Sequence, residues 1–148
     1  MGVKVIGHSR QPGPEWTYPH LPLNDLLAQS DVVSLHIPLT PETQSMFNAQ
    51  RFACFKRGAI LVNTARGELV DESALIHALK QGQLSLACLD VFAQEPLPAD
   101  HPLLKRDDVL ATPHMAWLTQ DMFQRALSVA IENTRRTLSG APLLHQVQ

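Results

Sequence analysis

Three side chains suited to anion binding and proton transfer stand in short connections of this sequence. Arg66 follows the apolar run 59–62 and precedes a helix start at Asp71, whereas Glu95 lies in a proline-bounded loop and His114 follows another short apolar run. Open α/β sheets place their chemistry in connections that follow buried strands. An arginine that holds a carboxylate and a His–Glu pair that moves a proton would suit oxidation of a hydroxy acid or reduction of a keto acid.

The elements that must position these side chains alternate between strands and helices. Strands are predicted at 3–8, 31–37, 59–63, 84–91 and 109–112, with a very short strand near Tyr18. Helices are predicted at 23–29, from an Asn48 cap to Phe55, from an Asp71 cap to Gly82, and from a Thr119 cap to about Ser139. Because the strands are almost continuously apolar, we expect a parallel sheet that is covered on both faces.

The last predicted helix has one apolar stripe, and Gly140 is predicted to end it. The stripe contains Phe123, Leu127, Ala130, Ile131, Thr134 and Leu138. The residues after Gly140 have no periodic pattern, so we expect an irregular tail.

Composition excludes several classes of function. The 148 residues are 45% hydrophobic and 18% charged, with a net charge of −2, so nucleic acid and anionic membranes are not expected partners. No apolar run is long enough to span a membrane, and no signal peptide is evident, so a cytoplasmic location is expected. Cys54 and Cys88 lack metal-type spacing and are predicted to be reduced core thiols, and no metal is expected.

Four segments resemble successive signatures of the D-isomer-specific 2-hydroxyacid dehydrogenases. They are S-D-V-V-S-L-H-I-P-L-T-P-E-T at 30–43, L-V-N-T-A-R-G-E-L-V-D at 61–71, L-D-V-F-A-Q-E-P-L at 89–97 and T-P-H-M-A-W at 112–117. The last variant is similar to the branch of glycerate dehydrogenases and glyoxylate or hydroxypyruvate reductases. The resemblance implies a Rossmann-like, doubly wound parallel sheet and an NAD(P)-dependent oxidoreductase acting on a small 2-keto or 2-hydroxy acid.

The same resemblance implies that the chain is the C-terminal portion of a longer enzyme. Family members carry a G-x-G-x-x-G loop at the first strand of the nucleotide domain, and these 148 residues contain no such motif. We therefore expect a sheet without its first strand and glycine-rich loop, a partial nucleotide domain over 1–139, and a tail at 140–148 that returns to a substrate domain. Such a chain is predicted to be poorly soluble and inactive alone, whereas its full-length parent is predicted to be a homodimer.

The resemblance also implies roles for individual residues. Arg66 would bind the substrate carboxylate, His114 would act as acid and base, and Glu95 would orient His114. The residues that match cofactor-lining positions of the family are Pro38, Thr43, Thr64, Ala65, Asp90 and Ala116. Trp117 is either a packing residue or a substrate contact. The histidines that match no motif, at positions 20, 77, 101 and 145, are expected to be solvated.

The end of the first predicted strand favours NADP over NAD. NAD-specific sites place an acidic residue here to bind the ribose 2′-hydroxyl, whereas an arginine accommodates a 2′-phosphate. No acidic residue precedes Glu15, and Ser9 and Arg10 stand at the matching place. Ser9 and Arg10 are therefore predicted to hold the 2′-phosphate of NADPH.

Two other interpretations stay open from the sequence. The chain could be a non-catalytic nucleotide-binding scaffold, because the same family includes transcriptional corepressors, or it could be a decayed fragment without function. The lack of basic or recognition tails favours an enzyme over a corepressor.

Overall fold

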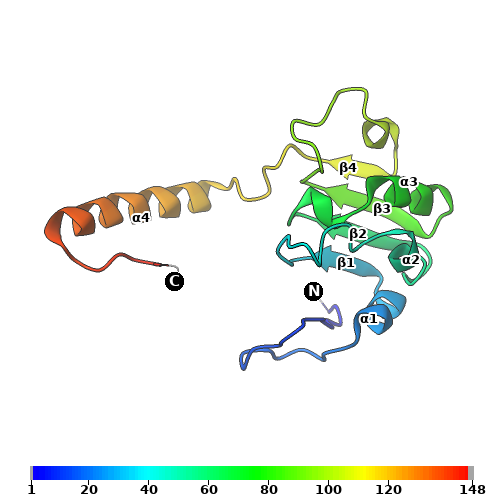
Figure 1. The fold of residues 1–148 in the computed structure, drawn as a ribbon, viewed down its shortest axis with the longest axis horizontal. Coiled ribbons are helices and arrows are strands. Elements are labelled where there is room, and N and C mark those ends of the chain that lie inside the picture. The colour runs from blue at the N-terminus through cyan, green and yellow to red at the C-terminus, as the bar shows by residue number, and fades with distance from the viewer. Residues whose placement is uncertain (1, 147–148) are drawn as a thin grey trace. The chain divides into compact units, whose positions relative to one another are not determined.

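The computed structural model describes residues 2–146, which form two compact units divided between Pro113 and His114. The first unit is a four-stranded parallel sheet with the order β1-β2-β3-β4 (Figure 1). Its strands are β1 (Val32–Leu35), β2 (Ala59–Asn63), β3 (Leu84–Leu89) and β4 (Val109–Ala111). The parallel sheet predicted from the apolar runs is thus confirmed, with β1, β3 and β4 shorter than expected.

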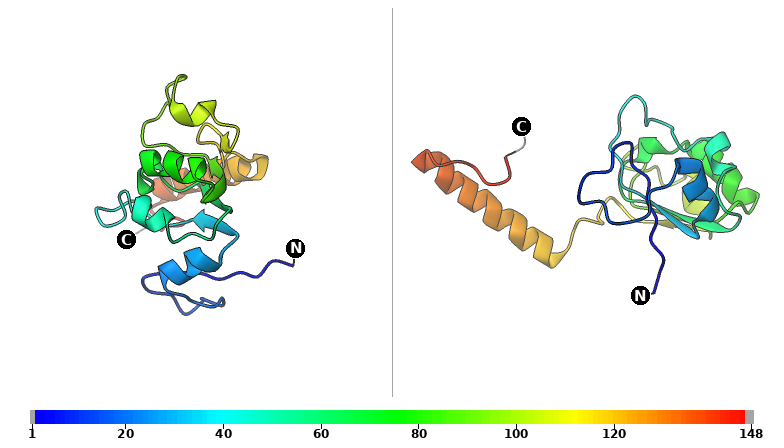
Figure 2. Two further views of the ribbon diagram at one scale, coloured as in Figure 1. Left: turned by 90° about the vertical axis from the view of Figure 1, so that its right-hand side faces the viewer. Right: turned by 90° about the horizontal axis from the view of Figure 1, so that it is seen from below.

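Three α-helices and two 3-10 turns connect these strands. The helices are α1 (Leu23–Gln29), α2 (Ala49–Phe52) and α3 (Glu72–Lys80), and the turns are η1 (Gly67–Leu69) and η2 (Pro102–Lys105). Asn48 caps α2 as predicted, but the helix ends at Phe52 instead of Phe55. Within this unit α2 packs against α3, and α3 packs against β3 (Figures 1 and 2).

The core lies on one face of the sheet. Its largest fully buried apolar side chains are Leu27, Phe52, Leu61, Leu69, Leu75, Leu84 and Leu103. On the other face the register aligns Val32, Ile60 and Leu86 in one row, and these side chains are only partly buried or exposed. The expected cover on both faces is therefore not present within the first unit. Cys54 and Cys88 are free, as predicted, but both are only half-buried, and Cys54 packs against the edge of the core.

The strand predicted at 3–8 is wrong. Only Gly7 pairs, in an isolated parallel bridge with His20, and Val3 and Val5 are exposed. A strand needs a hydrogen-bonding neighbour along its length, and among the described residues this segment has one only at Gly7, whose backbone bonds to Pro19 and Leu21. An added Cβ at Gly7 would lie 2.4 Å from the Trp16 ring, so Gly7 permits this close approach.

Helix α3 begins at a strong N-cap. Asp71 Oδ1 accepts hydrogen bonds from the Ser73 amide at 3.0 Å and the Ala74 amide at 3.1 Å, and from the Ser73 hydroxyl at 2.7 Å. The hydrogen bond from the Ser73 hydroxyl is the largest cause that lowers the pKa of Asp71 below its ordinary value of 3.8. The hydrogen bonds from the Ala74 and Ser73 amides lower the pKa further. The cap is therefore made by the ionised carboxylate.

Replacing Asp71 by alanine is expected to lower the free energy of unfolding by about 1 kcal/mol at neutral pH. Because the folded-state pKa is depressed, this stabilisation is complete above pH 3.8 and is lost as pH falls through the folded-state value. Urea unfolding of the two proteins across this range measures the difference. Asp107→Ala, which removes an exposed acid, is the control. If the free energy of unfolding depends on pH equally in both variants, the Asp71 cap is contradicted.

The second unit contains the long helix α4 (Gln120–Ser139), which runs as one continuous helix (Figure 2). Thr119 Oγ1 caps it by accepting from the Met122 amide at 3.2 Å, and Gly140 ends it in the left-handed region with φ +70°, as predicted. No described residue of α4 is buried, so the predicted apolar stripe is exposed.

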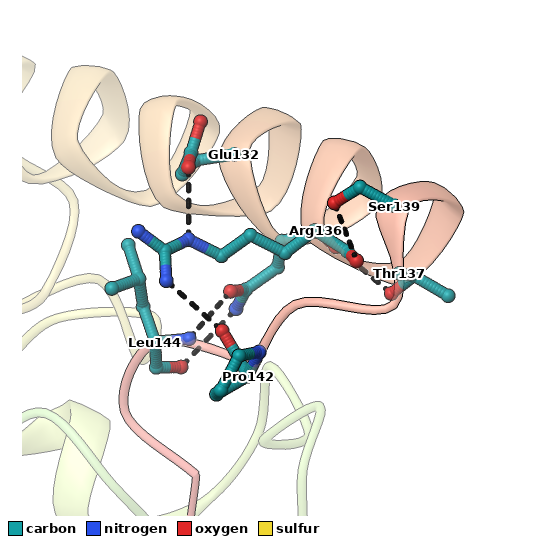
Figure 3. Close-up of polar contacts among 7 residues, drawn as sticks. Glu132, Arg136, Thr137, Ser139, Pro142 and Leu144 are labelled. Carbon is teal, nitrogen blue, oxygen red and sulfur yellow. Dashed lines mark hydrogen bonds and ion pairs between the residues drawn. The ribbon is translucent and has the colours of Figure 1, made fainter.

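The tail after α4 is irregular but held against the helix. The Asn133 side chain accepts from the Leu144 amide at 2.8 Å and donates to the Leu144 carbonyl at 3.2 Å. Arg136 donates to Glu132 Oε1 at 2.8 Å and to the Pro142 carbonyl at 3.0 Å (Figure 3). These bonds fix the direction of residues 141–144 along the last turns of α4, whereas residues 147–148 of the predicted tail lie outside the described residues.

Candidate active site

Apart from Ser9 and Arg10, the predicted site residues of the first unit follow the carboxyl ends of its strands. Because the strands are parallel, these ends share one edge of the sheet. The residues concerned are Pro38 and Thr43 after β1, Thr64, Ala65 and Arg66 after β2, and Asp90 and Glu95 after β3. The fold thus collects them at one edge, although they are spread over 58 positions from Pro38 to Glu95.

The turn that presents Arg66 is built on a buried amide side chain. Asn63 is 1% exposed; its Nδ2 donates to the Arg66 carbonyl at 2.9 Å, and its Oδ1 accepts from the Ala65 amide at 3.1 Å. Thr64 and Arg66 are exposed, and Arg66 Nη1 donates to the Ala65 carbonyl at 2.5 Å. Asn63 has no predicted role, although a polar residue at the end of an apolar strand could have signalled one.

Gly67 brings the Arg66 turn into contact with the loop that carries Glu95. A Cβ at Gly67 would lie 1.9 Å from the Phe92 carbonyl carbon and 2.4 Å from the Ala93 nitrogen. Atoms at these distances overlap, so only glycine allows the two loops to meet. The Glu95 carboxylate is fixed in the same place, because its Oε1 accepts from the Phe92 amide at 2.9 Å.

Asp90 joins the ends of three strands. It is 4% exposed; its amide donates to the Asn63 carbonyl at 3.0 Å, and its Oδ1 accepts from the Thr112 hydroxyl at 2.5 Å. These contacts tie the end of β3 to the ends of β2 and β4. In this structure the carboxylate therefore has a structural role, next to the nicotinamide role that the resemblance implies.

The loop after β1 is closed by Thr43. Its buried hydroxyl donates to the Pro38 carbonyl at 2.8 Å and accepts from the Thr40 amide at 2.7 Å. In the same loop the Thr40 hydroxyl bonds to Glu42 and lowers the pKa of that carboxyl, and the nearby charge of Arg10 lowers the pKa further.

Ser9 is held by His20, which stacks on His8. The Ser9 carbonyl lies 2.9 Å from His20 Nε2, and the His8 and His20 rings stack with their centroids 5.6 Å apart. His20 is exposed, as predicted, but it is bonded to the backbone. His101 was predicted to be solvated, and this is wrong: its side chain is 21% exposed and lies 3.2 Å from Glu72.

His114 and Ala116 belong to the second unit. His114 adopts the left-handed region with φ +50°, and its carbonyl accepts from Trp117 Nε1 at 3.1 Å. A histidine in this region is uncommon and is held by its surroundings. His114, Ala116 and Trp117 are exposed. Glu95 belongs to the first unit and His114 to the second, so the pairing of the two side chains stays a prediction.

Among residues 2–146, no group of three or more His, Cys, Asp or Glu side chains is arranged to hold a metal ion. No helix in the described part of the chain is long and apolar enough to cross a membrane.

Comparisons with known proteins agree on one family. Residues 1–116 match the D-isomer specific 2-hydroxyacid dehydrogenase, NAD binding domain. A glyoxylate reductase from Thermofilum pendens is 48% identical over 118 residues, which cover 80% of this chain and 35% of the relative. A hydroxypyruvate reductase from Blautia hydrogenotrophica is 36% identical over 146 residues, which cover 97% of this chain and 45% of the relative.

A solved structure has a similar fold. The D-isomer specific 2-hydroxyacid dehydrogenase from Xanthobacter autotrophicus Py2, in complex with NADPH and MES, is 43% identical with a TM-score of 0.82. The match covers 99% of this chain and 62% of that chain. The chain thus spans between a third and a half of the length of the two curated relatives. It belongs to the D-isomer specific 2-hydroxyacid dehydrogenase family, and its first 116 residues match the family's NAD binding domain.

Proposed function

We propose that this chain supplies part of the nucleotide domain of an NADPH-dependent reductase of small 2-keto acids of the glyoxylate or hydroxypyruvate class. One observation carries the proposal: an exposed arginine at the carboxyl edge of a parallel sheet is locked, through Gly67, to the loop that carries Glu95. The names of the Thermofilum and Blautia relatives support this substrate class. The boundary of the partial domain at residue 139 is part of the proposal.

Arg66 is the proposed substrate-binding residue. Its planar guanidinium carries a permanent charge and can donate two parallel hydrogen bonds to a carboxylate. A 2-keto acid held in this way presents its carbonyl beside the same cation, which polarises the carbonyl for reduction. The Asn63 side chain fixes the backbone on both sides of this turn and so limits where the guanidinium can reach.

His114 and Glu95 are the proposed proton-transfer pair. During reduction the imidazolium of His114 gives its proton to the carbonyl oxygen, and during oxidation the neutral ring takes the hydroxyl proton. A carboxylate beside the ring favours the imidazolium and orients it, which is the proposed task of Glu95. NADPH, when bound, supplies the hydride.

The cofactor would be held along the same edge of the sheet. The proposed lining residues are Ser9, Arg10, Pro38, Thr43, Thr64, Ala65, Asp90 and Ala116. Arg10 is a permanent cation and Ser9 a hydroxyl donor, and both stand in the segment where NAD-specific sites carry an acidic residue. This placement supports NADP over NAD.

The activity is tested in a fusion enzyme, which we define as this chain preceded by the complementary N-terminal part of the Xanthobacter autotrophicus Py2 dehydrogenase. NADPH oxidation is followed with glyoxylate, hydroxypyruvate and pyruvate. We expect turnover with glyoxylate or hydroxypyruvate in the fusion enzyme and none with the 148-residue chain alone. A fusion enzyme that binds NADPH but turns over no 2-keto acid would contradict the proposal. Light scattering of the same protein tests the proposed homodimer.

Replacing Arg10 by alanine is expected to reduce kcat/KM for NADPH about 10- to 100-fold, because hydrogen bonds to charged groups contribute about 1.5–3 kcal/mol. The value for NADH should change less than about threefold, since NADH has no 2′-phosphate. Initial rates with both cofactors measure the ratio. Arg57→Ala, which removes a cation that bonds to Gln81 instead, is the matched control. An unmodified fusion enzyme that prefers NADH would overturn the assignment.

A further inference from the structure

Two neighbouring backbone amides in the loop after β3 are each bound by a glutamate. The Phe92 amide donates to Glu95 Oε1 at 2.9 Å, and the Ala93 amide donates to Glu72 Oε1 at 3.1 Å. Glu95 belongs to this loop, whereas Glu72 lies in the first turn of α3. The same two backbone positions contact Gly67. Three separate elements therefore meet at Phe92 and Ala93.

The second oxygen of Glu72 binds the far end of the same loop. His101 Nε2 lies 3.2 Å from Glu72 Oε2, and the two side chains are 21% and 22% exposed. His101 Nδ1 accepts from the Leu103 amide, so the proton of a neutral ring resides on Nε2 and points to Glu72. The contact therefore needs no charge on His101. Glu72 holds residue 93 with one oxygen and residue 101 with the other, which fastens both ends of the Glu95 loop to α3.

We propose that Glu72, oriented by His101, is a positioning residue that sets the place of Glu95 in the active site. The proposal rests on the proposed role of Glu95 as the partner of His114. Glu72 acts on the reaction only through the Phe92–Glu95 turn, because its two oxygens are both used in holding the loop. A small displacement of a catalytic group costs up to about 100-fold in rate, so loosening this loop should be visible in kcat.

A double-mutant cycle in the fusion enzyme tests this route of action. Glu72→Ala and Glu95→Gln are each expected to lower kcat about 10- to 100-fold, and the double variant should be within about threefold of Glu95→Gln. Glu72→Gln keeps an oxygen for the Ala93 amide but cannot accept a hydrogen bond from His101 Nε2 with its amide nitrogen, so it should recover only part of kcat. Asp25→Ala removes an acid from the first turn of α1 and is the matched control, with kcat unchanged. Multiplicative effects of the two substitutions would overturn the proposal.

Hydrogen–deuterium exchange gives a readout that does not depend on catalysis. In Glu72→Ala, peptides covering the Phe92 and Ala93 amides should exchange faster, whereas peptides from β2 should not change. Unaltered exchange at these amides would overturn the positioning role even if kcat falls. If Glu95→Gln has full activity while Glu72→Ala loosens the loop, then the proposed role of Glu95 fails and the contact itself stands. The two failures are thus distinguishable.

Discussion

Substitution of Arg66 by alanine is expected to lower kcat/KM for the preferred 2-keto acid about 10³-fold in the fusion enzyme. Removing one member of a close charge pair costs about 2–5 kcal/mol, which is about 30- to 4,000-fold in rate. The loss should appear in both kcat and KM, because the guanidinium both binds the carboxylate and polarises the carbonyl. Steady-state rates over a range of keto-acid concentration measure the two parameters.

Arg66→Lys separates the charge from the shape of the side chain. Lysine keeps the positive charge but lacks the planar fork, so we expect it to recover only part of the loss. Both variants should unfold at the same temperature as the parent, because Arg66 is exposed and its recorded hydrogen bond is to the neighbouring Ala65 carbonyl. Arg57→Ala, which removes another exposed arginine of the first unit, is the control. Full activity in Arg66→Ala would refute the assigned role.

Substitution of Gly67 by alanine is expected to destabilise the first unit by at least about 3 kcal/mol and to abolish most activity. The new Cβ would lie 1.9 Å from the Phe92 carbonyl carbon and 2.2 Å from its oxygen, and neither is a flexible side-chain atom. The Arg66 turn and the Glu95 loop must therefore move apart. Urea unfolding measures the loss of stability, and turnover under conditions where the variant is folded measures the loss of alignment.

Gly58 provides the comparison for this effect. It has φ +78° and no atom within 4 Å of an added Cβ, so Gly58→Ala tests backbone strain without overlap. That substitution should cost about 1–2 kcal/mol and leave turnover of the folded enzyme unchanged. If both glycine variants lose the same stability and neither affects turnover, then the contact between the two loops does not hold the site together.

Much of the fold could be predicted because its signals are local. The caps at Asn48, Asp71 and Thr119 and the stop at Gly140 lie where the sequence placed them, since each depends on a few neighbouring residues. The segment 3–8 also has an apolar pattern that predicts a strand, but it forms only an isolated bridge at Gly7. Strand formation depends on a partner that may be distant in sequence, and a local pattern contains no information about that partner.

The candidate site could likewise be predicted only where its signals are local. Arg66 and Glu95 could be placed at one edge because each lies in a connection after an apolar run, and parallel strands end together. The supporting contacts could not be predicted. Glu72 has no predicted role in the site, and His101 was expected only to be solvated, because their contact joins positions 29 residues apart. The close approach of Gly67 to the Phe92 backbone could not be predicted either, because it joins two loops that are distant in sequence.

The sequential order of the strands has a consequence for how the sheet assembles. Each strand pairs with the next one in the chain, so paired positions such as Val32 with Ile60 and Cys88 with Leu110 are fewer than 30 residues apart. Closing loops of this length costs little entropy compared with the long-range closures of many parallel sheets, and low contact order favours rapid folding. The sheet that positions Arg66 and Glu95 can therefore grow pair by pair. Its folding rate should depend little on the length of any segment attached before β1.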